Sequence, residues 1–437
     1  MRYVIIGAGV AGLSAVESIR SVDKVGEILM ISDDPHGFYS RPGLAYYLTG
    51  ELHDKALFPR TKEDYKKLNF NFLNARVTRI LRSDHALLID GKSRLVYDKL
   101  LIAVGARALP LEVPGAAGLH GVMKLDHLTD AKNLIKLAKR GKTAVVVGGG
   151  ITALELTEGL HARGMHVHYL LRGDRYWSNV LDKHESQVVE GLLRAEGVTL
   201  HYKAELQEVI GKKGSVTAVM LKDGSKLQCD LLAYAVGISP CLELVNETNL
   251  AKDRGLLVNE HLQTTDPDIY AAGDVAQVFD PLTGKSALDS LWNPAREQGR
   301  VAGWNMAGRK SAYLKSAPFN VTRLAGLTTT IIGVVGRGKD EDMIGIARGD
   351  SETWRELPEA IVAQSGFEIN HMRLMVGEKT LVGAIVMGDQ TLSWPLQKMI
   401  AGKADISSIR DQLMKPEAPL ADLLAQFWMS WRTQEAL

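Results

Sequence analysis

The sequence predicts an α/β fold in which two units with parallel sheets are followed by a C-terminal α+β unit. One pattern, which occurs twice, points to the first two units. A short apolar run, a set of spaced glycines and a helical segment follow one another, first from Arg2 and again from Lys142. A different pattern defines the last unit. From about residue 312 onward, strand-like runs at 328–335, 371–376 and 380–387 precede helices expected from Ser393 and from Ile406.

Composition sets the outer bounds. The chain has 437 residues, of which 46% are hydrophobic and 24% charged, so it has room for two or three domains. Its formal net charge of +1 argues against nucleic acid or an anionic membrane as a partner. Two cysteines are too few for a disulfide framework or an iron-sulfur cluster, and they suit a reducing compartment. Because no apolar run reaches 18 residues and the first strand starts at residue 3, the expectation is a cytoplasmic protein without a signal peptide.

The opening segment predicts a strand, a tight turn and a helix. The apolar run Tyr3–Ile6 leads into Gly7-x-Gly9-x-x-Gly12, and a helix is expected from Leu13 to Arg20. The first glycine permits the sharp turn, the second lets backbone amides approach a pyrophosphate, and the third lets the helix pack on the strand. The helix N-terminus then faces the anion with its partial positive charge. This segment is therefore predicted to bind a dinucleotide.

An acidic residue is expected about 20 residues after these glycines, where it meets the adenosine ribose. The second predicted strand, 28–31, ends at Ser32 and is followed by Asp33, the first choice, and Asp34, the second. Arg41, in the Gly- and Pro-rich stretch that comes next, is a candidate partner for the dinucleotide phosphates, and the alternative is an ordinary surface arginine.

The same pattern returns from Lys142, which predicts a second dinucleotide site. The strand 143–147 is followed by Gly148, Gly150 and a helix over 154–164. The next strand, 167–171, ends in Arg172 rather than in an acid, and Arg175 follows. Arginines there suit the 2′-phosphate of NADPH, so NADPH is slightly favoured over NADH. The alternative is that both arginines lie on a solvated loop.

A third signal lies near residue 270. The apolar strand from Ile269 ends in Gly273-Asp274, which places one carboxylate where the chain can approach a ligand closely. Soon after, Asn293-Pro294 has the chemistry of a helix start, and this helix is expected to end near Gly308.

Taken in this order, these motifs resemble those of the FAD-dependent pyridine nucleotide-disulfide oxidoreductases. The resemblance covers residues 1 to about 310 and includes the strand ending at Gly105 and the Gly237-Ile-Ser-Pro240 segment. It implies two Rossmann-like domains of the glutathione reductase type plus a C-terminal interface domain. The boundaries expected are FAD-binding 1–110 and 245–311, NAD(P)H-binding 111–244, and interface 312–437.

The resemblance also implies the binding residues. The residues expected at FAD are Gly7, Gly9, Gly12, Asp33, Asp34, Arg41, Val77, Ala103, Gly105, Gly273, Asp274, Val275 and Trp292. The residues expected at NAD(P)H are Gly148, Gly150, Ile151, Arg172, Arg175 and Gly237, with Glu155 positioning the nicotinamide. For Glu155 an exposed helix face is the alternative, and for Trp292 a plain packing role.

The departures from the family pattern define a branch. Pro42 stands where related enzymes carry a redox cysteine, and neither Cys229 nor Cys241 lies in a redox motif, so no catalytic cysteine is expected. The Tyr39-Ser-Arg-Pro42 stretch resembles rubredoxin reductases, oxygenase-coupled ferredoxin reductases and the flavin portion of NAD(P)H nitrite reductases. Tyr46 replaces a lysine of the ferredoxin reductases, and Ile151 an aromatic residue that shields the flavin.

This resemblance implies an FAD-dependent NAD(P)H oxidoreductase that passes electrons to a separate ferredoxin-, rubredoxin- or haem-type carrier protein. A hydride passes from NAD(P)H to the flavin, and the helix near Asn293 stabilises the resulting negative charge. Two alternatives stay open: an NAD(P)H oxidase, and a flavin-binding scaffold subunit of a redox complex.

The C-terminal unit raises questions of assembly. The resemblance implies that it builds a homodimer. One apolar helical face is expected over 420–431, formed by Leu420, Leu423, Leu424, Phe427, Trp428 and Trp431. Packing on its own domain or on a dimer mate is the main interpretation of this face, and docking to a partner or to a membrane complex is the other. No metal site is expected, since the alternating His166 and His168 lack further ligands nearby.

Overall fold

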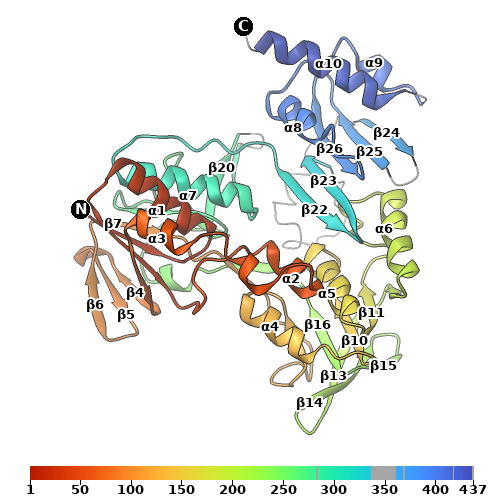
Figure 1. Cartoon of the computed structure of the whole chain (residues 1–437), viewed down its shortest axis with the longest axis horizontal. Coiled ribbons are helices and arrows are strands. Elements are labelled where there is room, and N and C mark those ends of the chain that lie inside the picture. The colour runs from red at the N-terminus through yellow and green to blue at the C-terminus, as the bar shows by residue number, and fades with distance from the viewer. Residues whose placement is uncertain (282–283, 336–360, 368–369, 417, 436–437) are drawn as a thin grey trace.

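The computed structural model describes residues 1–281, 284–335, 361–367, 370–416 and 418–435. Figure 1 shows three groups of elements, each built on its own five-stranded sheet. Two of these sheets are entirely parallel and the third is antiparallel. The predicted α/β class with two Rossmann-like units and a C-terminal α+β unit is confirmed. The boundaries between the domains stay a prediction.

The first sheet joins distant parts of the chain. Its order is β19 (Ile269–Ala271), β7 (Lys99–Ile102), β1 (Arg2–Ile6), β2 (Glu27–Ser32) and β3 (Asn71–Asn74). The strands β1, β2, β7 and β19 are mostly apolar and buried, as expected for a parallel sheet with helices packed on it, whereas the edge strand β3 is largely exposed. In the register, Ile6 lies opposite both Ile31 and Ile102. The chain segments that leave β1, β2 and β7 therefore emerge at one edge of the sheet.

Two helices pack closely on this sheet. They are α1 (Val10–Val22) and α7 (Trp292–Met306). A Cβ at Gly299 would lie 2.1 Å from the carbonyl oxygen of Ala11, and one at Gly303 would lie 2.5 Å from that of Ala15. Glycine at both positions is thus what brings the two helix backbones together. The expected cap at Asn293 was wrong by two residues, since α7 begins at Trp292 with Leu291 at the N-cap.

The second sheet repeats the arrangement within one stretch of chain. Its order is β12 (Thr199–Tyr202), β11 (His166–Leu171), β10 (Thr143–Val147), β16 (Leu231–Tyr234) and β9 (Val122–Lys124). Its helices are α4 (Leu128–Leu137), α5 (Ile151–Ala162) and α6 (Lys183–Ala195). The register puts Val147 opposite Leu170 and Tyr234, so the segments after these strands again share one edge.

The third sheet is antiparallel, and the order of its strands differs from their order along the chain. Its order is β22 (Phe319–Leu324), β23 (Leu327–Gly333), β26 (Leu381–Met387), β25 (Asn370–Val376) and β24 (Ile361–Phe367). The helices α8 (Ser393–Ala401), α9 (Arg410–Leu413) and α10 (Leu420–Glu435) follow the last strand along the chain, and Figure 1 shows them beyond it, toward the C-terminus. The helix expected from Ile406 begins later than predicted, because α9 starts only at Arg410.

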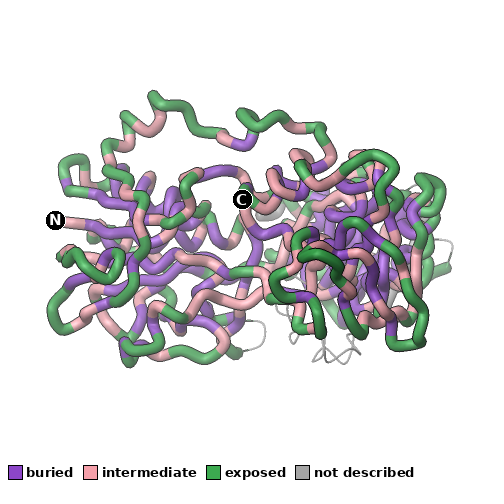
Figure 2. Tube along the Cα trace, turned by 90° about the horizontal axis from the view of Figure 1, so that it is seen from below, coloured by how far each residue is buried: buried purple, intermediate pink, exposed green. Residues whose placement is uncertain are grey.

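Smaller elements complete the three groups. The remaining helices are α2 (Gly43–Thr49), α3 (Lys62–Leu68) and the short 3-10 turns Asp54–Leu57, Arg82–Asp84 and Glu243–Val245. The remaining strands are β4 (Val77–Leu81), β5 (Ala86–Ile89), β6 (Ser93–Val96), β8 (Ala106–Ala108), β13 (Leu206–Lys212), β14 (Ser215–Leu221), β15 (Lys226–Gln228), β17 (Ile238–Pro240), β18 (Leu256–Leu257), β20 (Ala276–Asp280) and β21 (Lys285–Leu288). Figure 2 shows buried segments in the interior of the molecule, with exposed chain around them.

The apolar face of α10 packs on its own domain. Leu420 and Leu424 are almost fully buried, and the ring of Trp428 lies edge-on to Trp394 at 5.3 Å. Leu423, Phe427 and Trp431 are partly buried against the same core. The interpretation of packing within its own domain is thus confirmed for this face, while docking through 420–431 stays a prediction. Within the described residues, no helix is both long and apolar enough to span a bilayer.

Candidate functional site

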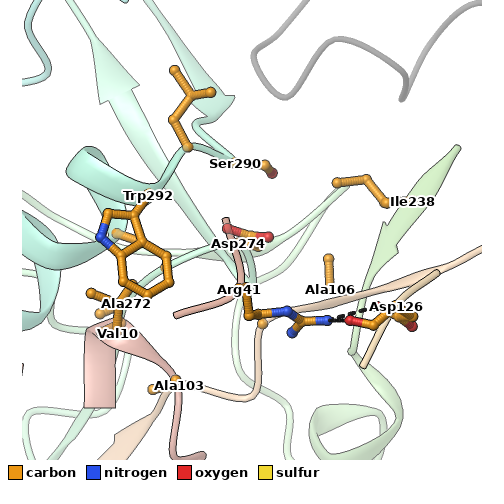
Figure 3. Close-up of a pocket in the computed structure, with 16 residues that line it drawn as sticks. Val10, Arg41, Ala103, Ala106, Asp126, Ile238, Ala272, Asp274, Ser290 and Trp292 are labelled. Carbon is orange, nitrogen blue, oxygen red and sulfur yellow. Dashed lines mark hydrogen bonds and ion pairs between the residues drawn. The ribbon is translucent and has the colours of Figure 1, made fainter. Parts of the chain in front are cut away.

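A first pocket opens at the edge where the strands of the first sheet end (Figure 3). It lies where parallel strands finish and neighbouring connections diverge, the usual position of ligand sites in such sheets. The pocket is lined by Gly9, Val10, Ala11, Arg41, Ala103, Gly105, Ala106, Asp126, Ile238, Ala272, Gly273, Asp274, Ser290, Leu291, Trp292 and Ala295. It therefore gathers seven of the residues that the sequence assigned to FAD.

The glycine turn after β1 has the shape that a dinucleotide needs. A Cβ at Gly7 would lie 2.2 Å from the carbonyl oxygen of Ala103, and Gly7 also has a φ of +110°. A Cβ at Gly12 would lie 2.1 Å from the carbonyl oxygen of Gly7. At Gly9, in contrast, no atom lies within 4 Å of a built Cβ, and the residue lines the pocket. The first and third glycines thus keep the backbone compact, and the second leaves open space that fits a bound phosphate.

The segment after β19 and the N-terminus of α7 both lie at this pocket. Asp274 follows β19, and the amide of Gly273 donates to the side-chain oxygen of Gln298 at 2.8 Å, which ties the loop to α7. The first turn of α7 lines the pocket through Trp292 and Ala295. The N-terminus of a helix carries partial positive charge, so this end of the pocket favours an anionic group.

Arg41 lies at the other side of the pocket and contacts a residue that the sequence analysis missed. Its guanidinium binds the carboxylate of Asp126 at 2.7 Å and also the Asp126 carbonyl oxygen (Figure 3). Burial works to raise the pKa of Asp126, but Arg41 and its other neighbours, among them the amide of Ala108 and Lys124, outweigh burial and hold the pKa below its usual range. Asp126 comes from the second sheet, after β9, and no motif marks it. Arg41 is thus held in place by a charge that a sequence pattern does not show.

Several residues assigned to FAD do not line the pocket. Asp33 is exposed after β2, and the carboxylate of Asp34 accepts from the amide of His36 at 2.9 Å and from the hydroxyl of Tyr39 at 3.2 Å. Val77 is buried at the start of β4, and Val275 is buried behind Asp274. Their assignments stay predictions.

A second pocket opens at the matching edge of the second sheet. It is lined by Leu111, Val113, Val147, Gly148, Gly149, Leu170, Leu171, Arg172, Gly173, Arg175, Trp177, Ser178, Ala204, Glu205, Leu206 and Val236. Gly148 has a φ of +144°, and its Cβ would lie 2.4 Å from the carbonyl oxygen of Ala235, so it repeats the role of Gly7. Gly150 is the N-cap of α5 and Ile151 its first residue. Neither they nor Gly237 line this pocket, so their assignments stay predictions.

The two predicted arginines both line the second pocket. The guanidinium of Arg175 is bound within its own loop, to the carboxylate of Asp174 at 3.1 Å and the carbonyl oxygen of Ser178 at 3.0 Å. The pocket also contains Glu205, which the sequence analysis missed. Glu205 lies more than 30 residues after the end of β11, so no local motif links it to Arg172. The second pocket therefore holds charges of both signs.

Glu155 lies on α5, half-buried, and lines neither of these two pockets. One turn further on, Glu158 accepts a hydrogen bond from the amide of Gly326 at 3.0 Å. Burial raises the pKa of Glu158 to about 7, and the charge of Glu155 adds to this shift. Glu158 is a partly buried acid that contacts the C-terminal domain through the amide of Gly326.

Neither cysteine lines either pocket. Burial raises the pKa of Cys229 to about 12, and burial also raises the pKa of Cys241. Both thiols therefore stay protonated near neutral pH, which disfavours attack on a disulfide or a flavin.

One group of acidic and histidine side chains lies elsewhere. Ligand atoms of Asp182, Glu185 and His371 lie within 4.8 Å of one another. The same Glu185 oxygen accepts from Arg373 at 2.9 Å and contacts Nε2 of His371 at 3.1 Å. Because Arg373 already neutralises the Glu185 carboxylate, the group forms an ion-pair network between α6 and β25 rather than a cation site.

Comparison with known proteins places these two pockets in context. A family model described as pyridine nucleotide-disulphide oxidoreductase matches residues 1–307. The chain is 28% identical over 421 residues to the assimilatory nitrate reductase electron transfer subunit of Bacillus subtilis, covering 95% of this chain and 51% of that protein. It is 30% identical over 350 residues to rubredoxin-NAD(+) reductase of Pseudomonas putida, covering 79% of this chain and 89% of that one.

A solved structure extends the match to the C-terminal sheet. The covalent putidaredoxin reductase-putidaredoxin complex contains a chain that is 25% identical, with a TM-score of 0.84, over 97% of this chain and 98% of that one. These findings confirm the predicted resemblance and its thiol-less branch. With a glycine turn at each of two parallel sheets and the family match over 1–307, the chain belongs to the pyridine nucleotide-disulphide oxidoreductase family.

Proposed function

We propose that this chain oxidises NAD(P)H by means of FAD and passes the electrons to a separate one-electron carrier protein of the ferredoxin, rubredoxin or haem type. The observation that carries the proposal is a flavin pocket whose lining contains no sulfur atom. Bound FAD would accept two electrons as a hydride and release them one at a time. Because no thiol lines the pocket to pass electrons on to a disulfide, the flavin would donate them directly to a one-electron acceptor. The names of the two relatives, an electron transfer subunit and a rubredoxin reductase, support it.

The residues of the first pocket have distinct roles in this proposal. The turn Gly7–Gly12 and the N-terminus of α1 hold the FAD pyrophosphate, since Gly9 leaves room for it. Asp274 binds the ribityl or phosphate part, and Asp33 or Asp34 the adenosine ribose. The positive end of α7, at Trp292, stabilises negative charge at the pyrimidine edge of the ring system. The ion pair with Asp126 keeps Arg41 oriented toward the pocket.

The second pocket takes the adenosine end of NAD(P)H in this proposal. The turn at Gly148 and the N-terminus of α5 hold its pyrophosphate, and Glu155 positions the nicotinamide. Arg172 and Arg175 support a slight preference for NADPH, because a guanidinium pairs well with a 2′-phosphate. The name of the Pseudomonas putida relative contains NAD(+), so both nucleotides belong in the test.

Three further proposals concern the setting. Both cysteines are free, which supports a reducing compartment such as the cytoplasm. The C-terminal domain is proposed to form a homodimer, and any docking through 420–431 must use the outer residues of α10, such as Met429, which is 53% exposed. The chain spans about half of the Bacillus subtilis relative, so the identity of the acceptor stays part of the proposal.

The test is an anaerobic titration of the purified holoprotein with NADH and with NADPH, in which flavin absorbance is followed and air is admitted at the end. Fast bleaching, slow reoxidation in air and rapid reduction of cytochrome c or a ferredoxin are expected. Fast reoxidation by oxygen with poor transfer to carrier proteins would support the oxidase instead. Flavin that neither nucleotide bleaches would support the scaffold alternative.

A matched variant tests the absence of a thiol relay. The double variant C229S/C241S should keep the wild-type rate of cytochrome c reduction, because neither thiol lines the pocket. A loss of more than about tenfold in that rate, with bound flavin retained, would contradict electron transfer without a thiol.

A further inference from the structure

We propose that Glu205 determines the choice between NADH and NADPH, by opposing Arg172 within the second pocket. This inference rests on the proposed function, in that the second pocket must receive the adenosine ribose of the nucleotide. The sequence pattern drew attention to the arginines alone, since they follow β11 directly. The structure adds a carboxylate to the same lining.

The backbone holds Glu205 beside the end of β11. Between β12 and β13, the amide of Lys203 donates to the carbonyl oxygen of Gly173 at 2.9 Å, and the amide of Ala204 donates to that of Leu171 at 3.0 Å. These two bonds flank Arg172 on both sides in the sequence. The segment that carries Glu205 is therefore tied to the segment that carries Arg172, and both residues line the pocket.

A second tie fixes the carboxylate in its charged form. Lys222, at the end of β14, binds Glu205 through its ammonium group, and its backbone amide donates to the carbonyl oxygen of Glu205 at 2.9 Å. The hydrogen bond and charge of Lys222, followed by the charge of Arg172, hold the pKa of Glu205 below its usual value. At neutral pH the pocket thus contains a carboxylate and a guanidinium that act on the same ligand.

The two charges favour different nucleotides. The ribose 2′-hydroxyl of NADH is a hydrogen-bond donor that a carboxylate accepts, whereas the 2′-phosphate of NADPH is repelled by a carboxylate and attracted by arginine. Arg175 also lines the pocket, and its guanidinium binds Asp174 and Ser178 within its own loop. Glu205 offsets Arg172, so the pocket accepts both nucleotides with only a slight preference for NADPH.

The test compares E205Q, R172Q and wild type in the holoprotein. The quantity measured is the ratio of kcat/KM for flavin reduction by NADPH to that by NADH. Removal of one like charge near the 2′-phosphate should raise the ratio about tenfold in E205Q, and R172Q should lower it by a similar factor. K222M should lower the ratio too, because it leaves Glu205 less neutralised. A matched control is E208Q, since Glu208 lies on β13, is exposed and does not line the pocket.

A binding measurement separates this proposal from the proposed function. Calorimetry with adenosine 2′,5′-bisphosphate and with 5′-AMP measures the affinity of the second pocket for each probe, and it does not depend on flavin reduction. E205Q should bind the bisphosphate about tenfold more tightly relative to 5′-AMP than wild type does. A change of less than about twofold in both ratios would overturn the role of Glu205. If wild type binds both probes but neither nucleotide reduces the flavin, the catalytic proposal fails while the role of Glu205 stands or falls on the calorimetry.

Discussion

Single residues at the two glycine turns have separable functions. Gly7 has no room for a side chain, because the carbonyl oxygen of Ala103 lies 2.2 Å from its built Cβ, whereas Gly9 faces open space. Both belong to one motif, and a sequence pattern treats them alike. The structure distinguishes a position where a side chain would collide with the backbone from one that faces open space in the first pocket.

The first prediction follows from this contrast. G9V should remain folded but lose FAD, because its side chain fills the space proposed for the pyrophosphate. G7A should destabilise the protein, by about 2–4 kcal/mol or enough to prevent folding, because both the contact and the positive φ oppose it. The measurements are the ratio of flavin to protein absorbance and the thermal midpoint of the apoproteins. Equal loss of stability in both variants would contradict the distinction.

The second prediction concerns Glu158. Its pKa is raised to about 7 in the folded protein from an ordinary 4.5, so the folded state binds the proton more tightly than the unfolded state. This stability is fully present below pH 4.5 and is lost as pH rises through 7, and its upper bound is about 3 kcal/mol. E158Q keeps an oxygen for the amide of Gly326 and cannot ionise. The thermal midpoint of E158Q should therefore fall less than that of wild type between pH 5 and 8, and parallel curves would contradict the assignment.

At the scale of elements, α2 is the piece that joins the three domains. Arg163, just after α5, donates to the carbonyl oxygens of Leu48 at 2.9 Å and Tyr47 at 3.1 Å, which are among the last of α2. Arg323 on β22 binds Glu51 through both of its terminal nitrogens and stacks on the ring of Tyr46. Figure 1 shows α2 beside α5. The segment that starts with Arg41 at the first pocket is thus braced by the other two domains.

The third prediction tests that brace. R163M leaves two helix-end carbonyls without a partner, so the thermal midpoint should drop by the equivalent of about 1–3 kcal/mol. FAD should also dissociate faster, since α2 follows directly on Arg41 and Pro42. The control is R60M, because the ion pair between Arg60 and Glu17 lies at the surface. A normal rate of flavin loss in R163M would show that α2 does not support the pocket.

At the scale of the whole molecule, one buried carboxylate connects the domain built on the second sheet with the C-terminal domain. Glu185 is fully buried and accepts from the amide of Asp182 at 2.8 Å, as part of the cap of α6. Its other oxygen contacts Arg373 and His371 of β25. The carboxylate therefore serves a helix end and a neighbouring domain at the same time.

The fourth prediction is that this group couples unfolding of the two domains. R373M removes the charge partner of Glu185 and should cost about 3–5 kcal/mol, since a buried carboxylate is left without its arginine. Calorimetry should then resolve separate transitions where wild type shows the two domains unfolding together. The double variant E185Q/R373M should recover part of the loss, because it removes the buried charge as well. A single unchanged transition in R373M would exclude the coupling.

Much of the fold was determined by the sequence alone, because strands, glycine turns and helices are local patterns of a few residues. The units at Arg2 and Lys142, the C-terminal strands near 328–335, 371–376 and 380–387, and the apolar face of α10 were all predicted. The helix starts at 292 and 410 were not, since helix ends depend on capping contacts with neighbouring segments.

What only the tertiary structure decided is which charges meet. Asp126 lies 85 residues from Arg41, Glu205 comes from a different strand connection than Arg172, and Glu185 pairs with a residue 188 positions away. No local period links such residues, because the order of strands in a sheet brings together segments that the chain separates. The sequence therefore determined the two glycine turns, and the packing of domains decided the electrostatic environment of each.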